Sequence, residues 1–128
     1  MIQRLSSGGP WEDEIGYSRA VMAGDLAMVS GCTATVDGQV VHEDDPYEQT
    51  RTAFQIALWS LERLGLDSDA VVRTRMYITR AADSAEVGRA HASLFKDVRP
   101  AASMLVVAGL IDPRMLVEVE VEAYRGTS

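Results

Sequence analysis

The sequence predicts an α+β fold in which two helices cover one face of a mixed β-sheet, a two-layer sandwich. Three observations support this prediction. Two segments repeat apolar residues at helical spacing behind N-capping signals, several others alternate or are rich in β-branched residues, and turn signals separate them. The chain has 128 residues, the size of one domain, so we expect a single domain over residues 1–128.

The first part of the chain has the pattern of short strands joined by tight turns. Gly24-Asp25 is a two-residue turn signal, and Asp37-Gly38 suits the positive φ angles of a hairpin turn. Ser6–Pro10 is expected to form a loop that is mobile through Glu14. The strands expected here are residues 17–23, 26–30, 33–36 and 39–42.

Two amphipathic helices and three strands follow. The first helix begins at Asp45-Pro46, an N-cap acid with proline at the first helical position, and ends at Gly65. The second begins at Asp83 and ends near Arg99-Pro100. Their apolar faces hold Phe54, Ala57, Leu58, Leu61 and Leu64 in the first, and Val87, Ala90, His91, Leu94 and Phe95 in the second. The strands are the β-branched run 71–78, residues 103–108 and residues 116–124.

Two of these strands alternate in a way that assigns their faces. Val117, Val119 and Val121 lie opposite Glu118, Glu120 and Glu122, and Val72, Thr74, Met76 and Ile78 lie opposite Arg73, Arg75 and Tyr77. We expect the two apolar rows to lie under the helices. The polar rows then pair across the strands on the other face, which is either solvated or a polar subunit interface.

Composition excludes several classes of function. The chain carries 12 basic and 19 acidic residues, a formal charge of −7, which repels phosphate backbones and anionic lipid. We therefore expect neither nucleic-acid nor membrane partners. The N-terminal residues lack the apolar stretch of a signal peptide, so a cytoplasmic location is expected. Cys32 is the one cysteine, and with only two separated histidines we expect neither a metal nor a cofactor.

Five segments resemble the YjgF/RidA (Rid) family in the right order: Gly16–Val21, Val29–Gly31, Tyr47–Thr50, Arg99–Ser103 and Leu116–Glu120. The resemblance covers nearly the whole chain, as a single RidA-like domain. It implies the chorismate-mutase-like fold and a homotrimer whose sheets line a central barrel, with small-molecule clefts between subunits. Well-known members hydrolyse reactive enamines and imines such as 2-aminoacrylate to a 2-oxo acid and ammonia.

The sequence departs from the family pattern at three positions. Active deaminases carry Pro-Ala-Arg where this chain has Pro100-Ala101-Ala102, and that arginine binds the substrate carboxylate. An alanine offers neither of the two charge-assisted hydrogen bonds of a guanidinium. Gly88 and Met104 likewise stand where many deaminases have asparagine and cysteine. The chain therefore resembles an arginine-lacking subgroup, which argues against 2-aminoacrylate as the substrate.

The resemblance assigns a catalytic role to Glu118, which would position or deprotonate a water molecule; the plain alternative is a member of the polar row. It also predicts a set of substrate-binding positions: Tyr17, Ser30, Gly31, Gly88, Ala102, Ser103 and Met104. Arg19 shares a strand face with Tyr17 but is expected at the surface, whereas Arg114 could supply the missing guanidinium from a turn. Cys32 is expected to be a buried, inert thiol and His91 a core histidine.

Three functions are compatible with these observations. The first is a RidA-like hydrolase acting on an imine, enamine or related intermediate. The second is a trimer of the same fold that binds a small metabolite or a protein without turnover. The third, an endoribonuclease, fits an acidic chain without a basic stripe least well.

Overall fold

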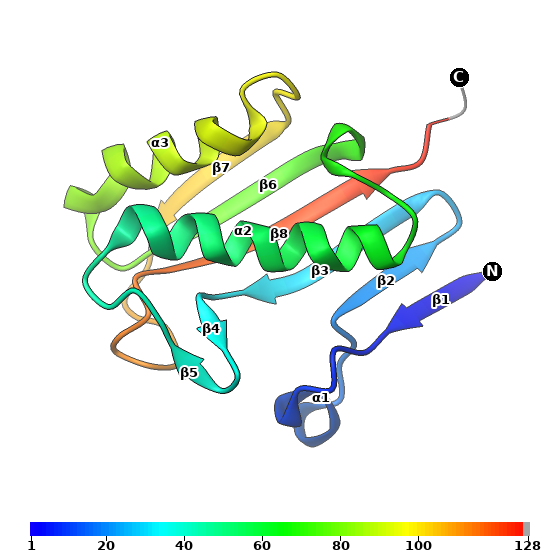
Figure 1. The fold of residues 1–128 in the computed structure, drawn as a ribbon, viewed down its shortest axis with the longest axis horizontal. Helices are drawn as coiled ribbons and strands as arrows, with labels where there is room; N and C mark the ends of the chain where they lie inside the picture. Colours follow the sequence, from blue (N-terminus) through cyan, green and yellow to red (C-terminus); the bar gives the residue numbers. More distant parts are fainter. Residues whose placement is uncertain (127–128) are drawn as a thin grey trace.

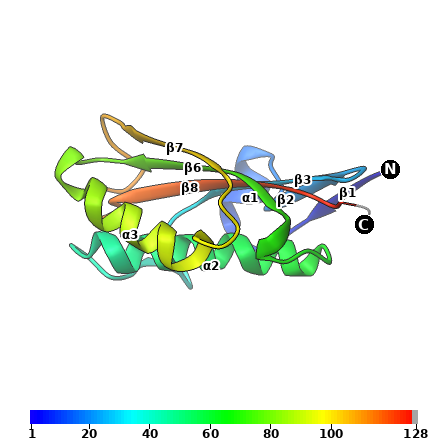
Figure 2. The same ribbon diagram turned by 90° about the horizontal axis from the view of Figure 1, so that it is seen from above.

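The computed structural model describes residues 1–126 and contains a six-stranded sheet with two long helices against one face (Figure 1). The helices are α2 (Pro46–Arg63) and α3 (Ser84–Phe95). Seen along the sheet edge, both lie on the same side of the strands (Figure 2). The predicted two-layer α+β sandwich is therefore confirmed.

The sheet has the strand order β1-β2-β3-β8-β6-β7, in which only β6 and β7 are parallel neighbours. The strands are β1 (Ile2–Leu5), β2 (Ala20–Ala23), β3 (Leu26–Cys32), β6 (Val71–Ile78), β7 (Ala101–Val106) and β8 (Val117–Tyr124). A separate hairpin joins β4 (Thr35–Val36) to β5 (Gln39–Val40), and short 3-10 turns cover Ser68–Ala70 and Ala81–Asp83.

Some predicted boundaries are wrong. Residues 17–19 precede β2 instead of belonging to it, and β7 begins two residues before the predicted position 103. Helix α3 ends at Phe95, because Arg99 adopts a left-handed φ of 56° and Pro100 has no N–H to continue a helix.

The predicted loop is present at residues 6–9, but residues 10–15 form a helix where the loop is expected to continue as a mobile segment through Glu14. β1 pairs with β2, and the helix α1 (Pro10–Ile15) follows, ending at Gly16 with φ of 90°. The Glu12 carboxylate is buried and accepts hydrogen bonds from Ser6 Oγ at 2.8 Å, Ser7 N at 3.1 Å and Ser7 Oγ. Burial raises the pKa of Glu12, but these hydrogen bonds outweigh burial and hold the pKa below its ordinary value. The serine loop is thus fixed to α1.

The core lies between the sheet and the helices, as the alternation predicts. Val117, Val119 and Val121 are at most 1% exposed, and Thr74, Met76 and Ile78 face the same layer. Val72 is an exception at 46% exposed, because the β6–β8 register shifts between Val71 and Arg73 and places Val71 inside instead.

His91 is a core histidine, as predicted. Its Nε2 lies 2.8 Å from Thr74 Oγ1, and its ring packs against Phe54 and Phe95 at centroid distances of 5.4 and 4.9 Å. Burial lowers the pKa of His91. The neutral imidazole is therefore the form that the folded chain accommodates.

This burial predicts a pH dependence of stability. The unfolded chain binds a proton at His91 near pH 6.5, whereas the folded chain binds it only at lower pH, so the stability linked to His91 is lost as pH falls below about 6.5. We expect the free energy of unfolding to drop more for the wild type than for His91→Gln between about pH 7.5 and about pH 5.5. Urea titrations of both proteins at the two pH values test this. All other titratable groups are present in both proteins, so the difference between the two drops reports on His91. Equal drops would contradict it.

Candidate functional site

Glu118 lies near the start of β8, on the sheet face opposite the helices. The neighbouring strand β3 is irregular between Val29 and Cys32, and Gly31 lies in this irregular part. The backbone of Gly31 approaches Glu118 so closely that a Cβ at position 31 would overlap the carboxylate. A side chain at position 31 would displace the Glu118 carboxylate, so the absence of one at Gly31 lets Glu118 lie where it does.

Glu118 differs from the other two glutamates of its row. Glu122 Oε1 lies 2.6 Å from Arg75 Nη1, and Glu120 Oε1 accepts a hydrogen bond from the Tyr77 hydroxyl at 2.5 Å. These contacts confirm the predicted cross-strand pairing. Among residues 1–126 we find no hydrogen-bond partner for the Glu118 carboxylate. Its half-buried position, and then the charge of Glu120, raise its pKa, whereas Arg19 opposes the shift.

Arg19 connects Glu118 to the predicted binding residues Tyr17 and Ser30. Its Nη2 donates to the Gly31 carbonyl at 2.6 Å, and its Cζ lies 5.8 Å from the centre of the Tyr17 ring. Ser30 N donates to the Arg19 carbonyl at 3.0 Å. Tyr17 and Ser30 also line an open groove of about 590 Å³ beside α1. Arg19 is half-buried, so the expectation of a surface arginine is wrong.

The remaining predicted binding residues lie on β7 and α3. Met104 faces α3, where its Cε is 3.9 Å from the position of a Cβ built on Gly88. Ala102 pairs with Thr74 and, by alternation, shares that face of the strand. Ser103 points to the other face, accepts a hydrogen bond from Arg73 Nη2 at 2.9 Å, and lines a groove of about 520 Å³.

These two groups of residues do not meet within one chain. β8 and β6 separate β3 from β7, and three strand spacings amount to about 14 Å. The structure therefore brings Tyr17, Ser30, Gly31 and Glu118 together, and places Gly88, Ala102 and Met104 at the far edge of the sheet.

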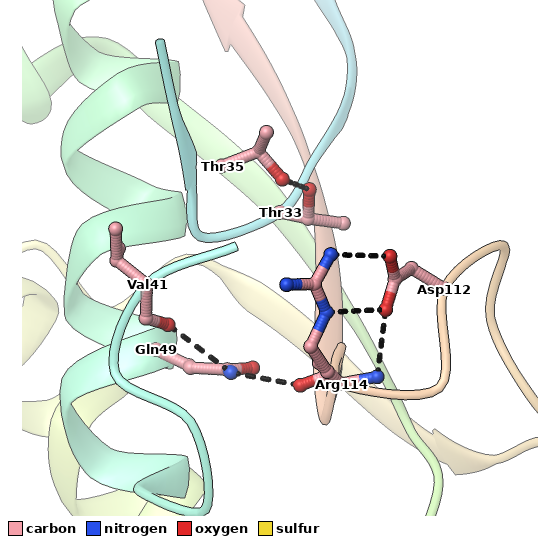
Figure 3. Close-up of polar contacts among 6 residues, drawn as sticks. All are labelled: Thr33, Thr35, Val41, Gln49, Asp112 and Arg114. Carbon is pink, nitrogen blue, oxygen red and sulfur yellow. Dashed lines mark hydrogen bonds and ion pairs between the residues drawn. The ribbon is translucent and has the colours of Figure 1, made fainter. Parts of the chain in front are cut away.

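Arg114 and Cys32 have structural partners. The Arg114 guanidinium donates to Asp112 through Nε at 3.0 Å and Nη2 at 2.9 Å (Figure 3), which holds the pKa of Asp112 at about 2. Cys32 Sγ donates to the Ser30 carbonyl at 3.3 Å, and burial raises the pKa of the Cys32 thiol to about 11. Arg114 is thus engaged in its own turn, and Cys32 is the buried thiol that was predicted.

Within residues 1–126, no group of three or more His, Cys, Asp or Glu side chains could hold a metal ion. No helix in this part of the chain is long and apolar enough to cross a membrane.

The six-stranded mixed sheet with helices on one face is the architecture of the YjgF/L-PSP class of α+β proteins. The family described as Endoribonuclease L-PSP matches residues 11–125. The chain belongs to this family, the YjgF/RidA family that its sequence resembles.

Individual relatives agree with this result. An uncharacterized protein of Streptomyces coelicolor is 49% identical over 125 residues, covering 98% of this chain and 93% of its own length. A crystal structure of a YjgF/YER057c/UK114 family member from Mycobacterium tuberculosis is 40% identical, with a TM-score of 0.89 and coverage of 98% and 100% of the two chains. A Rid family protein from Yersinia pestis is 26% identical, with a TM-score of 0.84 and the same coverage.

Proposed function

We propose that this protein is a RidA-like hydrolase of small imines or enamines and that Glu118 is its catalytic residue. The observation that supports the proposal is the Glu118 carboxylate, which is half-buried, has a raised pKa and lies against the bare backbone of Gly31. Such a carboxyl group exchanges protons closer to neutral pH than an exposed one.

Imine hydrolysis needs this kind of group. Glu118 accepts a proton from water as the water oxygen bonds to the imine carbon, and it passes this proton to the nitrogen, which gives a carbinolamine. The carboxylate then takes the proton of the new hydroxyl group and passes it to the amino nitrogen. The carbon–nitrogen bond breaks, and ammonia and a carbonyl product leave. An enamine enters the same sequence after protonation at its carbon, which converts it to the imine.

We further propose that the complete site is a cleft between subunits of a homotrimer. The placement of these residues supports this. Ala102 and Met104 lie on the helix side of the sheet and Glu118 lies on the other side, so a second copy is needed to bring such residues near Glu118. The edge strand β7 also exposes two apolar side chains, Leu105 at 46% and Val106 at 58%. Sedimentation should give a mass of about three times 13.9 kDa, and a stable monomer would contradict the cleft between subunits.

A non-catalytic, metabolite-binding trimer is the second candidate function. Ala102 favours it, because it provides none of the hydrogen bonds of the guanidinium that family deaminases have there. The ribonuclease activity in the family description is a weaker candidate, since a charge of −7 repels RNA.

The test is ammonia release from a panel of imines generated in situ by an amino-acid oxidase, with semicarbazide trapping as a second readout. We expect the wild type to hydrolyse imines other than 2-aminoacrylate. Ala102→Arg is expected to raise the rate with 2-aminoacrylate by about 30-fold, the lower end of what a charged partner contributes in a desolvated site. Silence of both proteins on every imine would favour the binding trimer.

A further inference from the structure

Arg19 is a cation without an ion-pair partner in the middle of the candidate site. Within residues 1–126 the side-chain ion pairs join Arg75, Arg80, Arg89 and Arg114 to acidic residues. Arg19 is in none of them. Its one side-chain hydrogen bond in this part of the chain goes to the Gly31 carbonyl, and its Nε is shielded from solvent without a partner.

Two carboxyl groups, those of Glu12 and Glu118, feel the charge of Arg19, but neither forms an ion pair with it. Glu12 is already saturated by hydrogen bonds from Ser6 and Ser7. Glu118 influences Arg19 across Gly31 but lies beyond ion-pair distance, and its raised pKa shows that Arg19 compensates it only in part. A half-buried guanidinium with free donors is the group that most often binds a carboxylate in proteins.

We propose that Arg19 binds the carboxylate of the substrate, a role that residue 102 has in the family's deaminases. Arg19 donates to the carbonyl oxygen of Gly31, and Glu118 packs against the α-carbon of Gly31. The cation and the carboxyl group therefore lie against the same residue. This spacing fits an imino acid, whose carboxylate is bonded to the reactive carbon. The inference rests on the proposed hydrolase only for the identity of the reaction, and not for the binding of the anion.

In the proposed cleft between subunits, a second copy supplies Gly88, Ala102 and Met104 as the wall opposite Arg19. These residues extend the proposal to the rest of the substrate. Gly88 and Ala102 leave space where family deaminases have asparagine and arginine, and Met104 adds an apolar surface. With its carboxylate on Arg19, the substrate directs its side chain toward that wall. An imino acid with a branched aliphatic side chain fills this space, whereas 2-aminoacrylate leaves it empty.

The chain contains a matched control for Arg19. Arg73 is also half-buried and in no ion pair within residues 1–126, its Nε is also shielded and unpartnered, and it borders the other groove. Arg73 Nη2 is bound to Ser103 Oγ, far from Glu118. If any unpaired arginine on this sheet bound carboxylates, Arg73 would do so equally well.

The experiment measures the affinity of the assembled protein for α-ketoisocaproate and for its methyl ester by calorimetry at fixed ionic strength. The ester keeps the same carbon skeleton, lacks the negative charge and is larger by one methyl group. We expect the wild type to prefer the acid by about 30-fold or more, and Arg19→Gln to lose that preference while binding the ester as the wild type does. Arg19→Lys should retain part of the preference, and Arg73→Gln all of it.

Three results would overturn the proposal. They are equal affinity of the wild type for acid and ester, an unchanged preference in Arg19→Gln, and a preference lost in Arg73→Gln alone. The wild-type comparison holds even if Arg19→Gln does not fold. Measuring ammonia release distinguishes a failure of this proposal from a failure of the proposed hydrolase activity. If Arg19→Gln still hydrolyses imino acids at the wild-type rate, only the role of Arg19 is contradicted. Binding that depends on Arg19 without turnover of any imine removes only the hydrolase.

Discussion

Replacing Glu118 by glutamine is expected to lower the rate of imine hydrolysis by about 100- to 10,000-fold, the usual contribution of a positioned acid–base group. Glutamine has nearly the same shape and fits against Gly31, but it cannot accept a proton from water. The measurement is ammonia release from the imine that the wild type hydrolyses fastest. Circular dichroism and sedimentation should show an unchanged fold and assembly.

Glu120→Gln is the matched control for this prediction. Glu120 lies two residues further along the same strand face and is engaged by the Tyr77 hydroxyl. Its loss should leave the rate within a few-fold of the wild type, apart from the small change in the pKa of Glu118 that follows from removing a neighbouring charge. Equal losses in Glu118→Gln and Glu120→Gln would reduce Glu118 to a member of the polar row.

Gly31→Ala is expected to displace the Glu118 carboxylate without changing Glu118 itself. The new Cβ displaces the end of a flexible side chain, so we expect the rate to fall strongly while stability changes little. Gly109→Ala offers the comparison, since a Cβ there has no neighbour within 4 Å and Gly109 is outside the candidate site. A rate unaffected by Gly31→Ala would mean that the position of Glu118 against Gly31 is not needed.

The sequence predicts the two long helices and the central strands because their signals are local. The N-cap at Asp45, for example, accepts its hydrogen bond from Glu48 N as the capping pattern requires. β1 and α1 were missed for the opposite reason. Ile2–Leu5 is a short edge strand held by its pairing with β2. α1 has only six residues and is fixed by hydrogen bonds from Ser6 and Ser7 to Glu12, which no helical periodicity reveals. Pro10 and Gly16 are its only local signals, a start and a stop.

The site was predictable in part. Strand alternation places Glu118 on the open face, and the family resemblance identifies Tyr17, Ser30 and Gly31, which the structure brings near it. Alternation cannot predict the approach of Gly31 to Glu118, because that contact depends on an irregular register between β3 and β8. Arg19 was misjudged for the same reason, since its partner is the carbonyl of Gly31. A charged residue two positions after a candidate aromatic residue, Tyr17, was the available signal.

Replacing Gln49 by leucine is expected to reduce the free energy of unfolding by about 3 kcal/mol or more, a large part of a typical total of about 5–15 kcal/mol. Gln49 is fully buried. Its Nε2 donates to the carbonyls of Val41 at 3.2 Å and Arg114 at 3.0 Å (Figure 3). Its Oε1 accepts from Leu116 N at 2.8 Å. Leucine fills the space but leaves three backbone groups without their side-chain partner. The buried one, Leu116 N, alone costs about 1–3 kcal/mol, and the two partly buried carbonyls add to this. Urea unfolding followed by circular dichroism measures the loss.

Gln55→Leu, an exposed position on the same helix, should change stability by no more than about 0.5 kcal/mol. A loss below about 1 kcal/mol in Gln49→Leu would mean that water or a shifted backbone replaces the three hydrogen bonds. Gln49 also affects the candidate site, because its partner Leu116 stands directly before β8 and two residues before Glu118. Gln49 therefore sets where β8 begins, and the register of β8 determines whether Glu118 meets Gly31. A destabilised Gln49 variant that still folds should accordingly lose imine hydrolysis beyond its loss of folded protein.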